Sequence, residues 1–255
     1  MNVKLYKQLL AQSIQESIAY RSTSVIVAIF SVIFFVTEIV VGVVLFDQTS
    51  LLAGWSKQQY FMLVGVSALI NSLYQFFFIV SHENLAESII EGELDYIFLK
   101  PVNSFYFYAF NRIDLPSLVN TVLAVVLIIS LQNRVHVLTL VFFILSILLS
   151  VWFLFLINQI IVTFSFWIEK GGKFLAIPEY LADIASKPYS IYPKMFIFLF
   201  TWICPFFLAF NMPVLLLKQT GYWKQLLYFL VFVFLLHKFA TYLWRKGLRK
   251  YQSSN

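Results

Sequence analysis

The chain has 255 residues, of which 61% are hydrophobic and only 12% are charged, and its mean hydropathy is +0.84. Soluble domains usually carry about 25% charged residues, so the composition excludes an ordinary soluble domain and indicates an all-α polytopic membrane protein. The net charge of +6 is interpreted through the placement of Lys and Arg, and we expect no nucleic-acid partner. The single cysteine, Cys204, excludes an internal disulfide and a cysteine-based metal site.

The first 22 residues do not have the compact apolar core of a cleavable signal peptide. Their apolar residues instead fall on one side of a helix, namely Leu5, Leu9, Ile14 and Ile18. This pattern favours an amphipathic helix that lies in the membrane interface over residues 1–22. An ordinary cytosolic extension is the alternative, because the stripe is short.

A membrane-spanning helix needs about 20 mostly apolar residues. The hydropathy pattern predicts six such spans, at residues 25–46, 60–80, 113–131, 137–166, 195–217 and 225–244. No polar segment between them is long enough to form a core of its own, so residues 1–255 form a single membrane domain.

Lys and Arg predict the orientation of these spans, because they accumulate on the cytosolic side. With a cytosolic N-terminus, the inner segments hold Lys4, Lys7, Arg21, Lys100, Arg112, Lys170, Lys173, Lys187, Lys194, Lys238, Arg245, Lys246, Arg249 and Lys250. The outer segments hold only Lys57, Arg134, Lys218 and Lys224. We therefore expect both termini and the loops 82–104 and 168–194 in the cytosol. The connections 47–59, 132–136 and 218–224 would lie outside.

Acidic residues stand close together in the loop 82–104, in a chain that is otherwise poor in charge. Glu83, Glu87, Glu91 and Asp95 recur every fourth residue, which puts four carboxylates on one face of a helix. An apolar stripe runs beside them, formed by Leu85, Ile89, Leu94 and Phe98. Gly92 is expected to bend or end a first short helix, and Pro101 to end a second. The loop is either a docking surface for a basic partner or a solvated loop whose acids aid solubility.

A few polar side chains interrupt the predicted spans. Glu38 is the acidic residue deepest in a span, so it must pair, face water or be neutral. It lines a substrate path or braces a helix interface. Asn71 and Gln75 share one helix face, and Asn120 and Asn158 are isolated amides. Such amides serve either as ligands of a substrate or as hydrogen bonds between helices.

Several kinds of chemistry are missing from the sequence. The nearest approach to a phosphate-binding loop is Gly172-Lys173, but Phe174 follows it and Trp167 occupies the position of the upstream glycine. The three histidines, His82, His136 and His237, are too scattered for a metal cluster. No nucleophile or metalloprotease motif occurs. We therefore expect no enzyme activity, no catalytic residue, and no cofactor or metal bound by this chain.

The segment from Glu91 to Val102, EGELDYIFLKPV, resembles the signature Gly-x-Leu-Asp-x-x-Leu-x-(Arg/Lys)-Pro of bacterial ATP-binding-cassette (ABC) permeases of the type-2 exporter class. Phe98 stands where Leu is commoner. Further similarities follow the family's order along the chain: Tyr20-Arg21 before the first span, Ala53 to Ser56 before the second, Pro188 to Pro193 with Pro205 and Pro213, and Gly247 to Ser254 at the end.

This resemblance implies a permease subunit that pairs with a second permease, identical or a sister chain, in the bacterial inner membrane. A separate ATPase dimer would bind ATP and Mg, and the loop 82–104 would be the coupling element that docks on it. The coupling residues implied are Glu83, Glu87, Glu91, Gly92, Leu94, Asp95, Lys100 and Pro101. The cargo would be exported, and the apolar, aromatic spans favour a lipid-like or amphipathic one. An ATPase-independent secondary transporter, a membrane-embedded enzyme and a regulatory membrane subunit are the alternatives.

Overall fold

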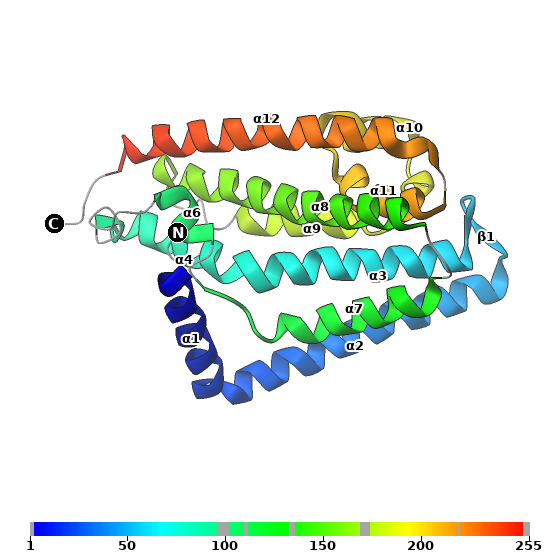
Figure 1. The fold of residues 1–255 in the computed structure, drawn as a ribbon, viewed down its shortest axis with the longest axis horizontal. Coiled ribbons are helices and arrows are strands. Elements are labelled where there is room, and N and C mark those ends of the chain that lie inside the picture. Colours follow the sequence, from blue (N-terminus) through cyan, green and yellow to red (C-terminus); the bar gives the residue numbers. More distant parts are fainter. Residues whose placement is uncertain are drawn as a thin grey trace.

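The computed structural model describes residues 3–95, 103–109, 112–132, 136–168, 174–218 and 220–251. The long helices run side by side along the long axis of the molecule (Figure 1). The first half of the chain comprises α1 (Val3–Ala19), α2 (Arg21–Gln48), β1 (Leu51–Leu52), β2 (Trp55–Ser56), α3 (Lys57–Tyr74), the π-helical turn η1 (Gln75–Ile79), α4 (Val80–Ile90), α6 (Ser104–Ala109) and α7 (Ser117–Leu131). The second half comprises α8 (Val137–Thr163), η2 (Phe164–Phe166), α9 (Ala176–Ala185), η4 (Tyr189–Ile191), α10 (Lys194–Phe198), η5 (Leu199–Ile203), α11 (Phe206–Lys218), η6 (Thr220–Tyr222) and α12 (Trp223–Leu248).

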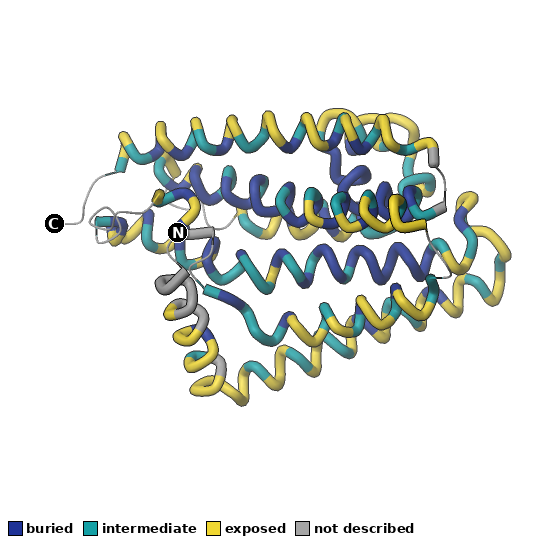
Figure 2. Tube along the Cα trace, in the orientation of Figure 1, coloured by how far each residue is buried: buried dark blue, intermediate teal, exposed yellow. Residues whose placement is uncertain are grey.

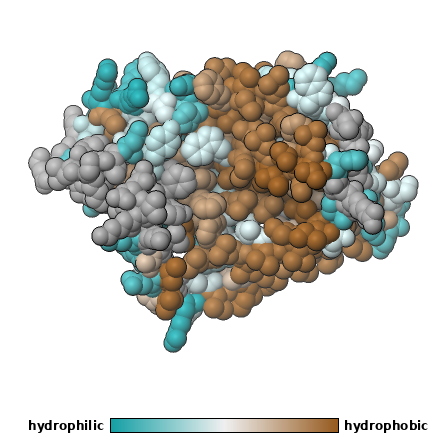
Figure 3. Space-filling model, viewed as in Figure 1, coloured by the Kyte–Doolittle hydropathy of each residue, from teal (hydrophilic) through white to brown (hydrophobic). Residues whose placement is uncertain are grey.

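The burial pattern is that of a helical bundle with an apolar exterior. In the most apolar stretch of α2 only 17% of the residues are buried, and in α12 only 22%, against 56% in the helix formed by α3, η1 and α4. Figure 2 shows the buried interior helices between two exposed outer ones. The exposed residues are apolar and form a broad band across the molecule, with hydrophilic residues toward its two ends (Figure 3). Such a band is expected where lipid replaces water as the solvent.

Four of the six predicted spans correspond to helices long and apolar enough to cross a membrane. They are Arg21–Gln48, Lys57–Ile90, Val137–Phe166 and Trp223–Leu248. The third predicted span is a shorter helix, α7, with 15 residues. At 1.5 Å per residue it is about 22 Å long, so it falls short of a hydrocarbon core of about 30 Å. An extended segment precedes it, where the Asp114 carboxylate accepts a hydrogen bond from the Ser117 amide at 3.2 Å.

The predicted span at residues 195–217 is not one continuous helix. The helical segments Lys194–Ile203 and Phe206–Leu217 meet at an angle of 91°. The bend falls at Cys204 and Pro205, where the proline lacks the amide proton that a continuous helix needs. Tyr189 precedes this pair and Tyr222 follows it, and both line the same cavity. The chain therefore enters and leaves the pair at the same end of the bundle. This arrangement favours a re-entrant pair of helices over a single crossing, and we refer to Lys194–Ile203 and Phe206–Leu217 as the re-entrant pair.

The described residues of the segment 168–194 do not all lie at the end of the bundle predicted for this loop. The hydroxyl of Ser190 donates a hydrogen bond to the carbonyl of Ala53, in the connection predicted on the opposite face, at 2.8 Å. Phe166, just before this segment, packs against Trp244 at the other end of the bundle, with ring centroids 5.4 Å apart. The described residues 174–194 therefore run along the bundle, with α9 lying among the long helices (Figure 1).

A short hairpin and a capped helix form the end of the bundle that Ser190 reaches. Strands β1 and β2 are joined by Ala53 and Gly54, which have φ values of 48° and 87°. Positive φ at both positions is typical of the tight turns that suit the twist of a hairpin. Ser56 then begins α3 with a capping box, in which Gln59 returns the hydrogen bond.

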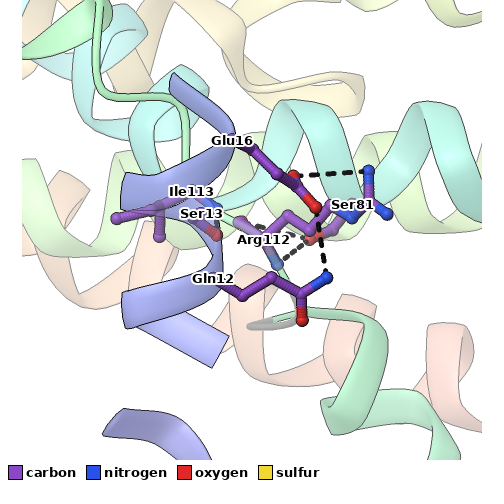
Figure 4. Close-up of polar contacts among 6 residues, drawn as sticks. All are labelled: Gln12, Ser13, Glu16, Ser81, Arg112 and Ile113. Atoms are coloured by element: carbon purple, nitrogen blue, oxygen red, sulfur yellow. Dashed lines mark hydrogen bonds and ion pairs between the residues drawn. The ribbon is translucent and has the colours of Figure 1, made fainter. Parts of the chain in front are cut away.

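The segment predicted to lie in the interface forms the helix α1, which meets α2 at a sharp angle next to Tyr20, the N-cap of α2 (Figure 1). Figure 4 shows how its polar side docks on the segment before α7. The Ile113 amide donates to the Ser13 hydroxyl at 3.3 Å, and Arg112 lies 3.7 Å from Glu16. Of the predicted apolar stripe, Ile14 and Ile18 are exposed, whereas the side chains of Leu5 and Leu9 lie outside the described part. An exposed apolar stripe suits a helix on a lipid surface.

Candidate functional site

A polar cleft inside the bundle brings together the polar residues that interrupt the predicted spans. Glu38, Asn71, Gln75 and Asn120 line one cavity of about 230 Å³. Asn71 and Gln75 also line a neighbouring cavity of about 200 Å³ that includes Asn158. The two cavities share three residues, Asn71, Gln75 and Asp183, so we treat them as one feature, the polar cleft.

Helices α2, α3, α7, α8 and α9 contribute to the polar cleft. Asn71 and Gln75 share a face of α3, as their four-residue spacing predicts. Gln75 also begins the π-helical turn η1, which interrupts the regular helix beside the cleft. Turns of this kind occur frequently at functional sites.

Glu38 is paired, which was one of its three predicted states. The Lys187 ammonium lies 2.7 Å from Glu38 Oε1, and the two side chains are 30% and 41% exposed. The backbone around Lys187 is held by Asn211, whose amide donates to the carbonyls of Ala185 and Lys187 and accepts from the Tyr189 amide. The pair thus ties α2 to the segment that follows α9.

Sequence reasoning missed the contribution of α9, because residues 168–194 were predicted as a loop outside the membrane. Glu179, Asp183 and Ser186 line the polar cleft. A signal was present in the sequence: Glu179, Asp183 and Lys187 recur every fourth residue, which puts three charges on one helix face. Its short length, with Pro178 inside it and Pro188 just after it, hid this helix from a hydropathy search.

Several polar atoms at the cleft are buried and lack a partner among the described residues. Asn158 is 2% exposed, and its amide nitrogen donates to the Leu154 carbonyl at 2.9 Å, but its Oδ1 accepts no hydrogen bond there. Oδ1 of Asn120 and the hydroxyl of Ser67 are likewise buried and form no hydrogen bond with another described residue. Buried polar atoms in folded proteins are nearly always satisfied, so these atoms need water or a ligand.

The acidic stripe lies on the exposed side of α4 and the turn after it. Glu83, Glu87 and Glu91 are exposed, and we call these three residues the acidic face. Gly92 ends the helix with φ of 73°, and the Glu93 amide donates to the Ser88 carbonyl at 2.9 Å. This is the Schellman arrangement that favours glycine, and it confirms Gly92 as the end of a first helix.

The apolar stripe beside the acidic face is not available to a partner. Leu85, Ile89 and Leu94 are at most 6% exposed, because they pack into the core of the chain itself. The Leu94 amide also donates to the Tyr251 hydroxyl at 2.9 Å, so the turn is held against the end of α12. Of the two predicted stripes, the described residues that are exposed are those of the acidic face. Asp95 is half-buried, and the predicted residues Phe98, Lys100 and Pro101 lie outside the described residues.

A buried histidine connects α4 to the rest of the bundle. His82 is fully buried; its Nδ1 lies 3.0 Å from the Tyr74 hydroxyl and its Nε2 lies 3.2 Å from Gln159 Oε1. One tautomer satisfies both contacts, with Nε2 donating and Nδ1 accepting. The ring also stacks on Phe155 at 5.2 Å between centroids. The network joins α3, α4 and α8, and no group of ligands for a metal occurs in the described part of the chain.

Comparison with known proteins agrees with the resemblance in the sequence. Residues 24–255 match the model of the family described as ABC-2 family transporter protein. No curated protein and no solved structure matches the chain. The match covers nearly all of an apolar helical bundle that carries a polar cleft, and the chain therefore belongs to the ABC-2 family of transporter proteins.

Proposed function

We propose that this chain is the membrane subunit of an ABC exporter in the bacterial cytoplasmic membrane. A dimer of ATPase subunits binds ATP and Mg on its inner face, and a second permease subunit, identical or a sister chain, completes the transporter. This chain carries the path for the cargo and binds no cofactor itself. The family supports the transporter class, and the polar cleft supports a path through the bundle.

The proposed topology has six crossings with both termini in the cytosol. The crossings are α2, the α3–α4 helix, α7, α8, the α9 segment and α12. Reassigning residues 168–194 removes Lys187 and Lys194 from the inner set. The remaining Lys and Arg still favour the inner side strongly, with Arg245, Lys246 and three further basic residues from Lys238 to Lys250 near the end of α12.

The observation that carries the coupling proposal is the continuity of the helix that bears the acidic face. Residues Lys57–Ile90 form one helix, with the acidic face at one end and Asn71 and Gln75 of the polar cleft along it. A push on the acidic face therefore moves a wall of the cleft. The His82 network ties the same helix to α8, so the motion is shared by the bundle.

The coupling proposal is tested by charge reversal at the acidic face. The double variant Glu87→Lys/Glu91→Lys is expected to lose co-purification with the ATPase subunit. The introduced lysines would repel the basic groove proposed for that subunit. Asp47→Lys is the matched control, since Asp47 is an exposed acid near the other end of the bundle. Co-purification that is equal for the double variant and the control would refute the coupling role.

A further inference from the structure

The polar cleft carries an excess of negative charge. Lys187 neutralises Glu38 at 2.7 Å. Glu179 and Asp183 also line the cleft, and neither forms an ion pair with another described residue. A carboxylate in a partly apolar surrounding gains more from an opposite charge than it does in water. The cleft is therefore electrostatically suited to a cation.

An independent observation points to a hydrogen-bond donor as the missing partner. Asn158 lines the cleft and is only 2% exposed, and its Oδ1 accepts no hydrogen bond from another described residue. Its orientation is fixed, because the amide nitrogen already donates to the Leu154 carbonyl. Only a donor group can satisfy Oδ1. An ammonium has three donors and no acceptor.

The walls of the cleft add an apolar and aromatic component. Phe34 and Phe35 of α2 line the first cavity together with Val64, and Tyr74 and Leu154 line the second. Phe34 is 69% exposed, so it borders the opening of the cleft on the lipid-facing side of α2. Aromatic faces attract cations as well as apolar chains.

We propose that the polar cleft binds a cargo with a protonated amine attached to an apolar body. Asp183 and Glu179 pair with the ammonium, Oδ1 of Asn158 accepts one of its hydrogen bonds, and Phe34 and Phe35 contact the apolar body. This cargo class rests on the proposed function, in which the cleft is part of the export path.

Binding to the purified chain in phosphatidylcholine nanodiscs tests the proposal without the ATPase. The probe is a dansyl-labelled alkylamine, compared with its neutral N-acetyl analogue and with an alkyl sulfonate of the same length, each corrected for binding to empty discs. The ammonium probe is expected to bind about tenfold more tightly than the neutral analogue, the size expected for one charge-assisted hydrogen bond. The sulfonate is expected to bind most weakly.

Variants assign the preference to the cleft. Glu179→Gln/Asp183→Asn keeps the side-chain shapes and is expected to abolish the tenfold preference. Glu87→Gln/Glu91→Gln, on the acidic face, is expected to leave it unchanged. Monodisperse elution and an unchanged Tm show that each variant is folded.

Two results would overturn the cargo proposal: equal binding of the ammonium and neutral probes to the native chain, or a full preference in the Glu179→Gln/Asp183→Asn variant. Both are independent of the ATPase. A chain that prefers the ammonium probe but never associates with an ATPase would refute the proposed transporter mechanism and leave the ligand class standing.

Discussion

Glu38 and Lys187 are 149 positions apart in the chain, and their charged groups lie 2.7 Å apart. One side chain belongs to α2 and the other to the segment after α9. A carboxylate on a lipid-facing helix is costly without a partner, so the position of α9 is what makes Glu38 tolerable there.

This ion pair predicts a measurable coupling between the two residues. Glu38→Gln and Lys187→Gln should each lower stability, because each leaves one charge unpaired, and the double variant should recover part of the loss. Since the side chains are 41% and 30% exposed, we expect a coupling energy of about 1 kcal/mol. Thermal unfolding of the four proteins in nanodiscs gives this value. Additive effects would show that the pair does not contribute.

The His82 network predicts a larger effect on stability. His82→Leu leaves the Tyr74 hydroxyl and Gln159 Oε1 without their partner in the core, and we expect a loss of about 2 kcal/mol or more. His136→Leu is the matched control, because His136 is exposed and makes no side-chain capping bond to α8. It should change stability by less than about 0.5 kcal/mol. Equal Tm values for the two variants would contradict the network.

Gly92 predicts a conformational requirement at the end of α4. A side chain at φ of 73° is strained, so Gly92→Ala should cost about 1 kcal/mol and disturb the turn that presents Glu91. Gly221→Ala is the control, since a Cβ there meets nothing within 4 Å and its φ is not in the left-handed region. We expect weaker ATPase co-purification for Gly92→Ala only. The prediction fails if both variants retain the partner equally.

The re-entrant pair predicts a specific labelling pattern. In a Cys204→Ser background, Ile191→Cys should react with a membrane-impermeant maleimide on intact cells, because Ile191 is 45% exposed beside the hairpin contact of Ser190. Glu91→Cys, on the acidic face, should react only after the membrane is opened. If Ile191→Cys is also protected in intact cells, the traverse by the α9 segment is wrong.

The close approach of α2 and α3 predicts the effect of added volume. A Cβ at Gly42 would lie 2.6 Å from the ring of Tyr60 and 2.8 Å from that of Phe61. Gly42→Val should therefore force the helices apart and lower the free energy of unfolding by about 1 to 3 kcal/mol, the range typical of overpacking, which is seen as a lower Tm. Val43→Ala is an exposed neighbour on the same helix and should have little effect. A Tm unaffected by Gly42→Val would show that α2 does not pack as described.

The sequence by itself determined that this is a membrane protein, and it determined most of the long helices. Long apolar runs predicted α2, the α3–α4 helix, α8 and α12, because a span must be apolar along its whole length and this information is local. Four-residue spacing likewise determined the acidic face, and it placed Asn71 and Gln75 on the same face of a helix. Short motifs indicated the family. Within them, Gly92 has a structural reason, because it ends α4 with a positive φ of 73°.

Only the tertiary structure decided the path of residues 168–217 and the composition of the polar cleft. Hydropathy measures composition and cannot tell a crossing helix from a re-entrant pair such as Lys194–Ile203 and Phe206–Leu217. Nor can it find α9, a helix of 10 residues that is stable among other helices and too short for a hydropathy search. Glu38 meets Lys187, and Asn158 joins Asp183, through contacts between distant segments. Such contacts depend on how whole helices pack, and no local pattern in the chain contains them.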